Sequence, residues 1–191
     1  MKIIGFIGSP RKNGNTAWAV NQIIEGAKEQ GGETRVFYSN ELNINPCTGC
    51  LGCVESDRCI VDDDMQEIYD ALEQADVLVL GSPVYMGQMS AQAKIFTDRL
   101  FAQITPRFSP HFKEENAGKK LILVFTQGNP DPDMFGEYFD YTKRMFQLLE
   151  FDVQPLHLVA GTRNEPAHGR EDLPSILKEI GSSFMLGTYP K

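Results

Sequence analysis

Long hydrophobic runs are missing from this sequence. No apolar stretch in the 191 residues approaches the ~20 residues that a bilayer-spanning helix requires. The first eight residues are too few for the apolar region of a secretion signal, and they carry no cleavage-site pattern. We therefore expect a soluble, cytoplasmic protein.

Positive charge is also scarce. The chain has 18 Lys and Arg against 26 Asp and Glu, which gives a formal net charge of −8. An acidic surface repels phosphate backbones and anionic lipids, so neither nucleic acid nor a membrane is expected as the main partner. The hydrophobic share of 41% is ordinary for a globular protein and excludes disorder. The length fits one domain, which we place at residues 1–191.

Cysteine is also scarce, and its four positions are grouped in one part of the chain. All four cysteines of the chain lie between positions 47 and 59. In a cytoplasmic protein, thiols grouped in this way are metal ligands or redox groups more often than disulfides.

Apolar runs alternate with amphipathic segments from one end of the chain to the other. The runs predict buried strands at 2–8, 34–38, 76–82, 120–126 and, more weakly, 152–159. Between them the pattern predicts helices at 16–30, 62–75, 90–101, 133–149 and 173–186. Strands buried on both faces and separated by helices predict an α/β fold with a doubly wound parallel sheet.

The loop after the first predicted strand is rich in hydrogen-bond donors. Its candidate ligand-binding residues are the hydroxyls, amides and guanidinium of Ser9, Arg11, Asn13, Asn15 and Thr16. The following helix adds free N–H groups and the positive end of its dipole, which suits a terminal phosphate. The loop matches neither a Gly-x-Gly-x-x-Gly motif nor a P-loop. The alternative is a merely polar turn.

Two further loops follow strands at the same edge of the predicted sheet. One is Ser82–Ser90, in which Tyr85 and Met86 are able to pack on an aromatic ring, or alternatively belong to the core. The other begins at Thr126 and includes Gly128. Because ligands of parallel sheets bind at this edge, the three loops together favour one flat, phosphorylated ligand.

The cysteines follow the spacing C-x2-C-x2-C-x5-C, formed by Cys47, Cys50, Cys53 and Cys59. Structural zinc sites usually join two cysteine pairs through a longer spacer. Thiols this crowded favour an iron–sulfur cluster, since its iron atoms are reached from one wrapping loop. Zinc and unligated redox thiols are the alternatives. Gly49 and Gly52 are expected to allow the tight backbone.

These motifs resemble those of the iron–sulfur flavoprotein family, a branch of the NADPH-dependent FMN reductase-like flavodoxin superfamily. The resemblance implies a five-stranded flavodoxin-like sheet in the order 2-1-3-4-5, with a cluster-binding loop at about 40–61. It implies FMN and one [4Fe–4S] cluster held by the four cysteines. It places the phosphate at the first loop and the flavin ring beside Pro83, Val84, Tyr85, Met86 and Gly87.

The resemblance also implies electron transfer, with ferredoxin or a similar one-electron donor and with assembly as a homodimer or dimer of dimers. A local docking patch is expected from Arg58, Lys94, Arg99 or Arg107, because the acidic chain otherwise repels an acidic donor. The alternative function is an NAD(P)H-dependent FMN or quinone reductase with zinc or nothing at the cysteines. A redox sensor is a third possibility. The stretch 102–118 is expected to be a docked loop, an oligomer contact or a lid.

Overall fold

A sheet of parallel strands forms the centre of the protein. The structure is a computed structural model that describes residues 1–56, 58–103 and 117–189. The sheet order is β2-β1-β3-β5-β6, and each neighbouring pair is parallel. The main strands are β1 (Lys2–Ile7), β2 (Glu33–Tyr38), β3 (Val77–Tyr85) and β5 (Lys120–Thr126). This arrangement confirms the predicted order 2-1-3-4-5, because β5 and β6 are the fourth and fifth parallel strands.

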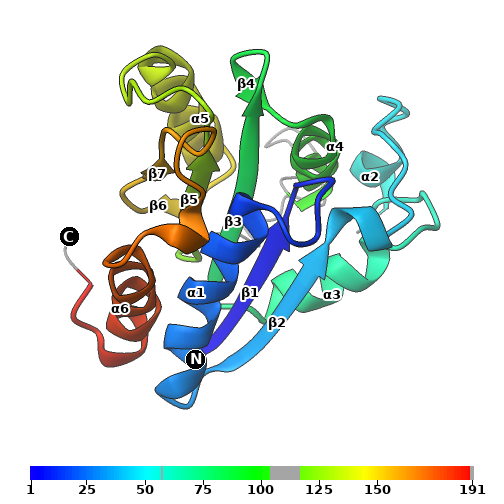
Figure 1. The fold of residues 1–191 in the computed structure, drawn as a ribbon. Coiled ribbons are helices and arrows are strands. Elements are labelled where there is room, and N and C mark those ends of the chain that lie inside the picture. Colours follow the sequence, from blue (N-terminus) through cyan, green and yellow to red (C-terminus); the bar gives the residue numbers. More distant parts are fainter. Residues whose placement is uncertain (57, 104–116, 190–191) are drawn as a thin grey trace.

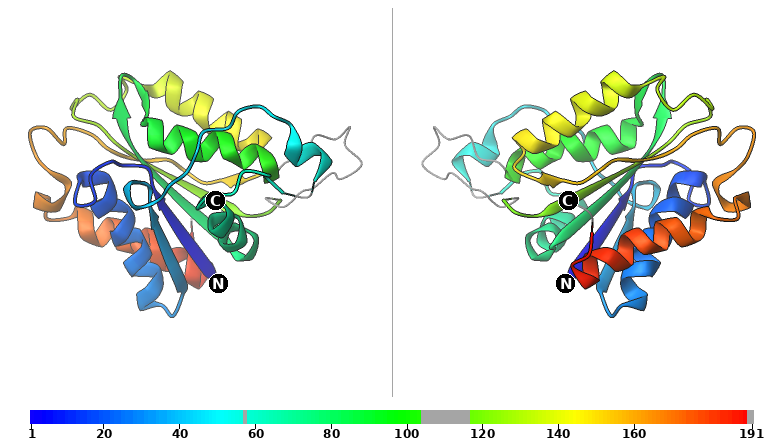
Figure 2. Two further views of the ribbon diagram at one scale, coloured as in Figure 1. Left: turned by 90° about the vertical axis from the view of Figure 1, so that its right-hand side faces the viewer. Right: turned by 90° about the vertical axis from the view of Figure 1, so that its left-hand side faces the viewer.

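Helices cover both faces of the sheet (Figures 1 and 2). On one face lie α1 (Asn15–Glu29) and α6 (Leu173–Leu186). The other carries α3 (Met65–Gln74), α4 (Ala91–Arg99) and α5 (Gly136–Leu148). Each layer has its own apolar core, which explains why the central strands are continuously hydrophobic instead of alternating.

Two glycines allow α1 and α6 to pack with their backbones almost in contact. A Cβ atom added to Gly181 would lie 1.8 Å from the carbonyl oxygen of Ile23, and one added to Gly26 would lie 2.0 Å from that of Lys178. No side chain fits at either position without separating the helices. The pair therefore fixes how closely α6 approaches α1 and, through it, the sheet.

The structure differs from the predicted strand at 152–159. Two short strands, β6 (Asp152–Val153) and β7 (His157–Val159), pair in succession with β5. Between them lies Pro155, which has no N–H to donate to a ladder. Lys120 pairs with Asp152 but Val124 pairs with His157, so the chain also gains one residue of register across the break.

The remaining elements are short. They are η1 (Ser39–Glu41), α2 (Gly52–Glu55), β4 (Gln88–Met89), η2 (Leu100–Gln103) and η3 (Ala167–Gly169). Of the expected surface stretch 102–118, residues 104–116 lie outside the described part of the chain, and so does Arg107. Among the helices of residues 1–56, 58–103 and 117–189, none has the length and apolarity needed to cross a bilayer.

Candidate functional site

Polar side chains are buried together at one edge of the sheet. β1, β3 and β5 end at this edge, which is uppermost in Figure 1. The buried polar residues in and next to the three loops are Ser9, Thr16, Ser82, Ser90, Thr126 and Gln127. The sequence pattern predicts the loops and a ligand-binding role for Ser9, Thr16 and Thr126, but not for Ser82, Ser90 or Gln127. The predicted ligand-binding loops therefore do meet at the edge where parallel sheets bind ligands.

The loop after β1 leaves the start of α1 open. Gly14 is the N-cap and offers no side chain, and the first turn contains no acidic residue. The first N–H groups of a helix have no partner within it, so they remain available to an anion. The Ser9 hydroxyl accepts a hydrogen bond from the N–H of Arg11 at 3.2 Å, which curls the loop around this position.

Two of the predicted phosphate ligands have partners inside the protein. The Oγ1 atoms of Thr16 and Thr126 lie 2.6 Å apart in a buried hydrogen bond between α1 and the end of β5. The side-chain oxygen of Asn15 accepts a hydrogen bond from the N–H of Ala167 at 2.9 Å. Both side chains therefore position the loop, whereas the exposed Arg11 and Asn13 face solvent.

Ser90 connects the first loop to the second. As N-cap of α4 its hydroxyl accepts a hydrogen bond from the N–H of Ala93 at 3.1 Å and donates one to the carbonyl of Gly8. Its own N–H donates to Ser82 Oγ at 2.9 Å. A Cβ on Gly8 would lie 2.5 Å from that of Ala93, so only glycine permits this approach. The start of α4 and the phosphate loop are thus one unit.

A tight hairpin projects from the end of β3. Val84 pairs with Met89 and Tyr85 with Gln88, so Met86 and Gly87 form a two-residue turn. Both have positive φ, 50° and 79°, as this class of hairpin turn requires. Met86 is fully exposed and Tyr85 is 43% exposed. The alternative that these two side chains belong to the core is therefore wrong.

Gln127 shapes the third loop. Its side-chain amide donates to the carbonyl oxygens of Asn129 and Asp131 at 3.1 and 2.6 Å, while its own Oε1 is buried without a partner among the described residues. The residue is 2% exposed. A polar residue directly after a continuously apolar strand was the sequence signal that could have identified it.

These features fit a flat ligand with a terminal phosphate. The open helix end and Arg11 match an anion. The turn at Met86 and Gly87 provides backbone groups and an apolar side chain at the next strand end, and the unpartnered acceptor of Gln127 lies at the third. FMN has a phosphate at one end and a planar ring with an N–H group at the other, so the residues present suit it.

The cysteines lie in a closed loop after β2. Two hydrogen bonds join its ends: the N–H of Asn43 donates to Asp64 Oδ2 at 2.6 Å, and the N–H of Asp64 donates to the carbonyl oxygen of Asn43 at 3.2 Å. Gly49 and Leu51 adopt positive φ, 67° and 59°. Gly52 does not, but a Cβ there would meet Ile60 at 2.6 Å. Of the two glycines expected to permit the tight backbone, Gly49 does so by its φ and Gly52 by its lack of a side chain.

All four cysteines line one pocket, together with residues at the end of α4 and in η2. Cys47 and Cys50 are exposed, while Cys53 and Cys59 are half-buried. Burial raises the pKa of the Cys53 thiol, and the neighbouring charges of the other three cysteines raise it further. Within the described residues, no three histidine, cysteine or acidic side chains meet in the geometry of a single-ion site. Four thiols that line one pocket are the donor set that both zinc and an iron–sulfur cluster take.

A buried ion pair lies behind this pocket. Arg99, at the end of α4, is 2% exposed and donates from Nη1 and Nη2 to the two oxygens of Asp63 at 2.7 and 3.1 Å. Burial disfavours the charged form of Asp63, but the hydrogen bonds from Arg99 and from the N–H groups of Asn45 and Met65, together with the charge of Arg99, outweigh it and lower the pKa of the carboxyl. The expectation that Arg99 contributes to a docking patch is therefore wrong, because its charge is committed inside the protein.

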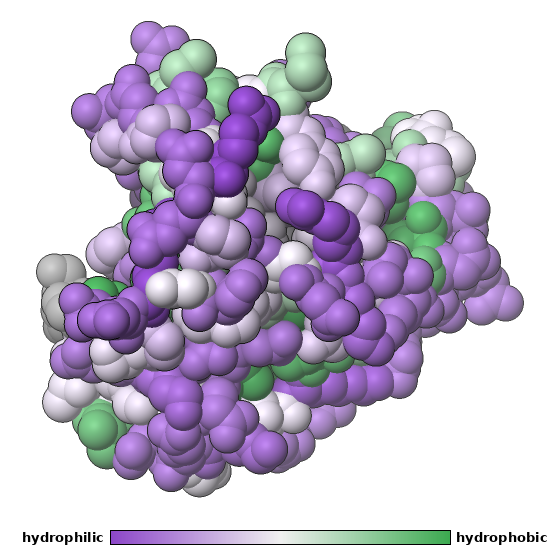
Figure 3. Space-filling model, in the orientation of Figure 1, coloured by the Kyte–Doolittle hydropathy of each residue, from purple (hydrophilic) through white to green (hydrophobic). Residues whose placement is uncertain are grey.

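The surface around the cysteines carries both charged and hydrophobic side chains. Arg58 and Lys94 are exposed but form ion pairs with Asp70 and Asp98. Hydrophobic residues reach the surface over α2 and α4, while hydrophilic residues cover most of the remaining face (Figure 3). Of the four expected docking residues, Arg58 and Lys94 remain as surface candidates.

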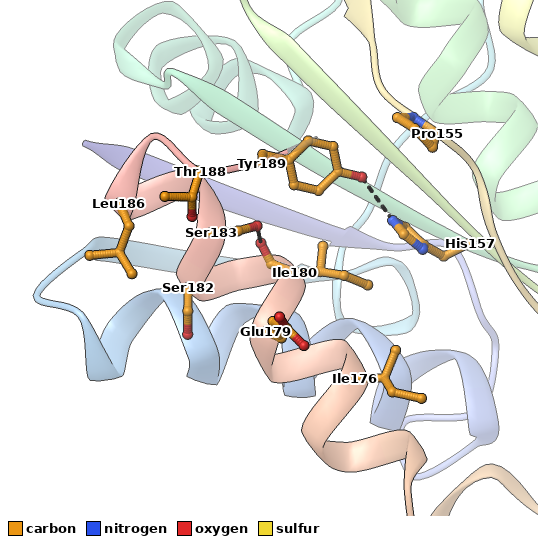
Figure 4. A pocket seen from close by; sticks show the side chains of 10 residues that line it. All are labelled: Pro155, His157, Ile176, Glu179, Ile180, Ser182, Ser183, Leu186, Thr188 and Tyr189. Atoms are coloured by element: carbon orange, nitrogen blue, oxygen red, sulfur yellow. Dashed lines mark hydrogen bonds between the residues drawn. The ribbon is translucent and has the colours of Figure 1, made fainter. Parts of the chain in front are cut away.

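A second pocket of about 530 Å³ lies between β7 and α6 (Figure 4). It is bounded by α6, β7 and the C-terminal segment, and at its wall His157 Nε2 and Tyr189 Oη lie 3.0 Å apart. None of the residues predicted to bind a cofactor lines it. This pocket is therefore separate from the residues predicted to bind the cofactors.

Comparison with known proteins agrees with this geometry. The profile of the NADPH-dependent FMN reductase family matches residues 1–131. An iron–sulfur flavoprotein of Archaeoglobus fulgidus is 37% identical over 185 residues, covering 96% of this chain and 79% of that protein. Another, of Methanosarcina thermophila, is 47% identical over 100 residues, covering 52% of each chain. The chain spans about half the length of several curated relatives that it matches.

Solved structures share the fold. An NAD(P)H:quinone oxidoreductase of Methanothermobacter marburgensis superposes with a TM-score of 0.73 at 15% identity, covering 96% of both chains. Identity this low shows the fold alone. The profile match and the 79% coverage of the Archaeoglobus relative show that this chain belongs to the iron–sulfur flavoproteins of the NADPH-dependent FMN reductase family.

Proposed function

We propose that this chain is an electron-transfer flavoprotein, with FMN at the ends of β1, β3 and β5 and one [4Fe–4S] cluster at Cys47, Cys50, Cys53 and Cys59. When bound, a cluster exchanges single electrons and a flavin one or two, so the pair joins a one-electron donor to a two-electron acceptor. The names of the relatives support both cofactors. The protein's own part is to hold the two groups and tune them by hydrogen bonds and burial.

The observation that carries this proposal is the shared pocket of the four cysteines, which are all the cysteines of the chain. Any thiol-bound metal must therefore be bound at this loop. The test is anaerobic purification followed by an absorption spectrum and assays of iron, acid-labile sulfide and zinc on one sample. We expect about four irons and four sulfides per chain. Cys53→Ser should lose them, whereas Thr48→Ala, in the same loop but without a ligand atom of this kind, should keep them.

Zinc or no metal in the same assay would overturn the cluster. That result, with rapid bleaching of the flavin by NADPH in stopped-flow, would instead establish an NAD(P)H-dependent FMN or quinone reductase. The structural match to a quinone oxidoreductase leaves this outcome compatible with the fold.

The phosphate site has its own test, because riboflavin differs from FMN only in lacking the phosphate. Arg11 is exposed in the phosphate loop, and its neighbour Lys12 is ion-paired with Glu41. We expect Arg11→Gln to weaken FMN by about tenfold to a hundredfold, the value of one charge-assisted hydrogen bond, and to leave riboflavin unchanged. Lys12→Gln is the matched control. Equal loss of both ligands in Arg11→Gln would contradict phosphate binding by this residue.

We also propose ferredoxin or a similar one-electron donor, and a homodimer or dimer of dimers. In one chain, α4 separates the two sites: it begins at Ser90, bound to Gly8, and ends at Arg99 in the cysteine pocket. Nine helical residues span about 13 Å. A second chain placing its flavin against the cysteine pocket would shorten this path. Sedimentation, together with the rate of flavin reduction by reduced ferredoxin, tests the oligomer and the donor. Fast flavin reduction in a strictly monomeric protein would refute the oligomer. No flavin reduction by ferredoxin would refute the donor.

A further inference from the structure

Arg99 is a fully buried cation held from one side. Its two terminal nitrogens are occupied by the carboxylate of Asp63, and Nη1 also donates to the carbonyl oxygen of Asn45 at 2.8 Å. Side-chain exposure is 1% for Arg99 and 0% for Asp63. The backbone carbonyl of Arg99 accepts a hydrogen bond from Tyr69 Oη at 2.7 Å, so the end of α4 is fixed as well. The guanidinium therefore has one orientation.

Among the described residues, one nitrogen of this guanidinium has no acceptor. Within the described part of the chain, the Nε–H of Arg99 is buried and has no hydrogen-bond partner. A buried donor without an acceptor is costly, and more so when it is charged. Arg99 lines the pocket formed by Cys47, Cys50, Cys53 and Cys59. The missing acceptor is thus expected from whatever that pocket holds.

We propose that Arg99 is a positioning and tuning residue for the cluster, whose Nε–H donates a hydrogen bond to a sulfur at the cysteine site and raises the reduction potential there. The inference rests on the proposed function, since it requires the cluster. Reduction adds one negative charge to the site, and a fixed cationic donor stabilises the reduced form more than the oxidised form. Asp63 keeps the guanidinium in place by occupying its other two nitrogens.

The geometry favours this role over a purely structural ion pair. A structural pair needs only the two contacts between guanidinium and carboxylate, and burying it offers little net stability compared with apolar residues. The fork of an arginine leaves Nε free when Nη1 and Nη2 both bind the carboxylate, whereas the three donors of a lysine lie on one rotatable nitrogen. The residue type and the unpartnered Nε, on a side chain that lines the cysteine pocket, both favour the proposed role.

The test is a redox titration of the anaerobically purified holoprotein, followed by EPR, with iron counted on each sample. Asp63→Asn/Arg99→Gln removes both charges together, so no charge is left buried and unpaired. Arg35→Gln is the matched control, because Arg35 is an exposed arginine paired with Glu67. We expect the double variant to favour the oxidised cluster about tenfold, a fall of about 59 mV for one electron. The control should equal the wild type.

A second measurement does not depend on the double variant keeping its cluster. Protein grown with arginine labelled by ¹⁵N at Nε should show a nitrogen coupling to the reduced cluster in pulsed EPR. Arg99→Lys, which keeps the positive charge, should abolish this coupling. Unchanged potential in an iron-loaded double variant, or no coupling in labelled wild type, would overturn the role of Arg99. Wild-type protein without iron would instead overturn the proposed function.

Discussion

Replacing Gly181 by alanine should destabilise the protein, although alanine is ordinarily the better helix former. In an exposed helix interior the change from glycine to alanine adds about 0.5–1 kcal/mol of stability. At Gly181 the new methyl would lie 1.8 Å from the carbonyl oxygen of Ile23 and 2.8 Å from the N–H nitrogen of Ala27. Both obstructing atoms belong to the backbone of α1 and cannot rotate away.

The size of the effect follows from these distances. Ordinary contact begins near 3.4 Å, so α6 must withdraw from α1 by about 1.6 Å to accept the methyl. The interface between α1 and α6, the largest between helices of the described residues, would open, and the apolar layer shared with the sheet would loosen. Adding one carbon to a packed core costs about 1–3 kcal/mol, and we expect about 3 kcal/mol because the backbone cannot yield.

Urea unfolding of the wild type and two alanine variants measures this, with all three at the same cofactor load because bound ligands stabilise the native state. Gly136→Ala is the matched control: it is also helical, and no atom lies within 4 Å of an added Cβ. With m values of about 1–3 kcal/mol per M, the midpoint of Gly181→Ala should fall by about 1–3 M. The midpoint of Gly136→Ala should stay or rise slightly. Equal midpoints for the two variants would refute the close helix approach.

Three further predictions concern buried polar groups. Thr126→Val leaves the buried Thr16 hydroxyl without its hydrogen-bond partner and should lower the free energy of unfolding in urea by about 1–3 kcal/mol. The double Thr16→Val/Thr126→Val variant should recover part of this loss. Asp63→Ala leaves the Arg99 charge buried and unpaired and should cost about 3–5 kcal/mol by the same assay, unlike removal of both charges. Burial lowers the pKa of His157, so the unfolded chain binds a proton more readily than the native state; stability should fall as pH drops below about 6.5, and His157→Gln should flatten that slope.

The sequence was sufficient for the sheet and for the place of the site. The continuous apolar runs at 76–82 and 120–126 correspond to β3 and β5. A strand buried on both faces is apolar at successive positions, so it is recognised in the sequence as an unbroken run. The loops that follow such strands necessarily share one edge, which located the ligand-binding loops without any knowledge of contacts. The last strand, predicted as one, is divided into β6 and β7 because Pro155 interrupts a pattern that periodicity alone joins.

Contacts between distant residues could not be predicted. Arg99 ends an amphipathic helix with neighbours that favour solvent, and only its pairing with Asp63, 36 positions earlier, buries it. Thr16 has the residue type of a phosphate ligand, but its partner is 110 positions away on β5. Positive φ at Leu51 and Met86 likewise follows from the shape of each loop, not from an amino-acid preference.

The closed ends of the cysteine loop make it a separable cassette. Asn43 and Asp64 are hydrogen-bonded to each other. In the part of the chain that the structure describes, no strand begins or ends between these two positions. A short turn joining the two positions would leave the sheet and the phosphate loop intact. In evolutionary terms, gaining or losing a metallocentre here requires an insertion or deletion at one site and a matching change at Arg99, whose buried charge pairs with Asp63 of the loop, without any change to the nucleotide-binding framework. The same site offers an exchange point for engineering other peptide-borne redox groups onto a flavin domain.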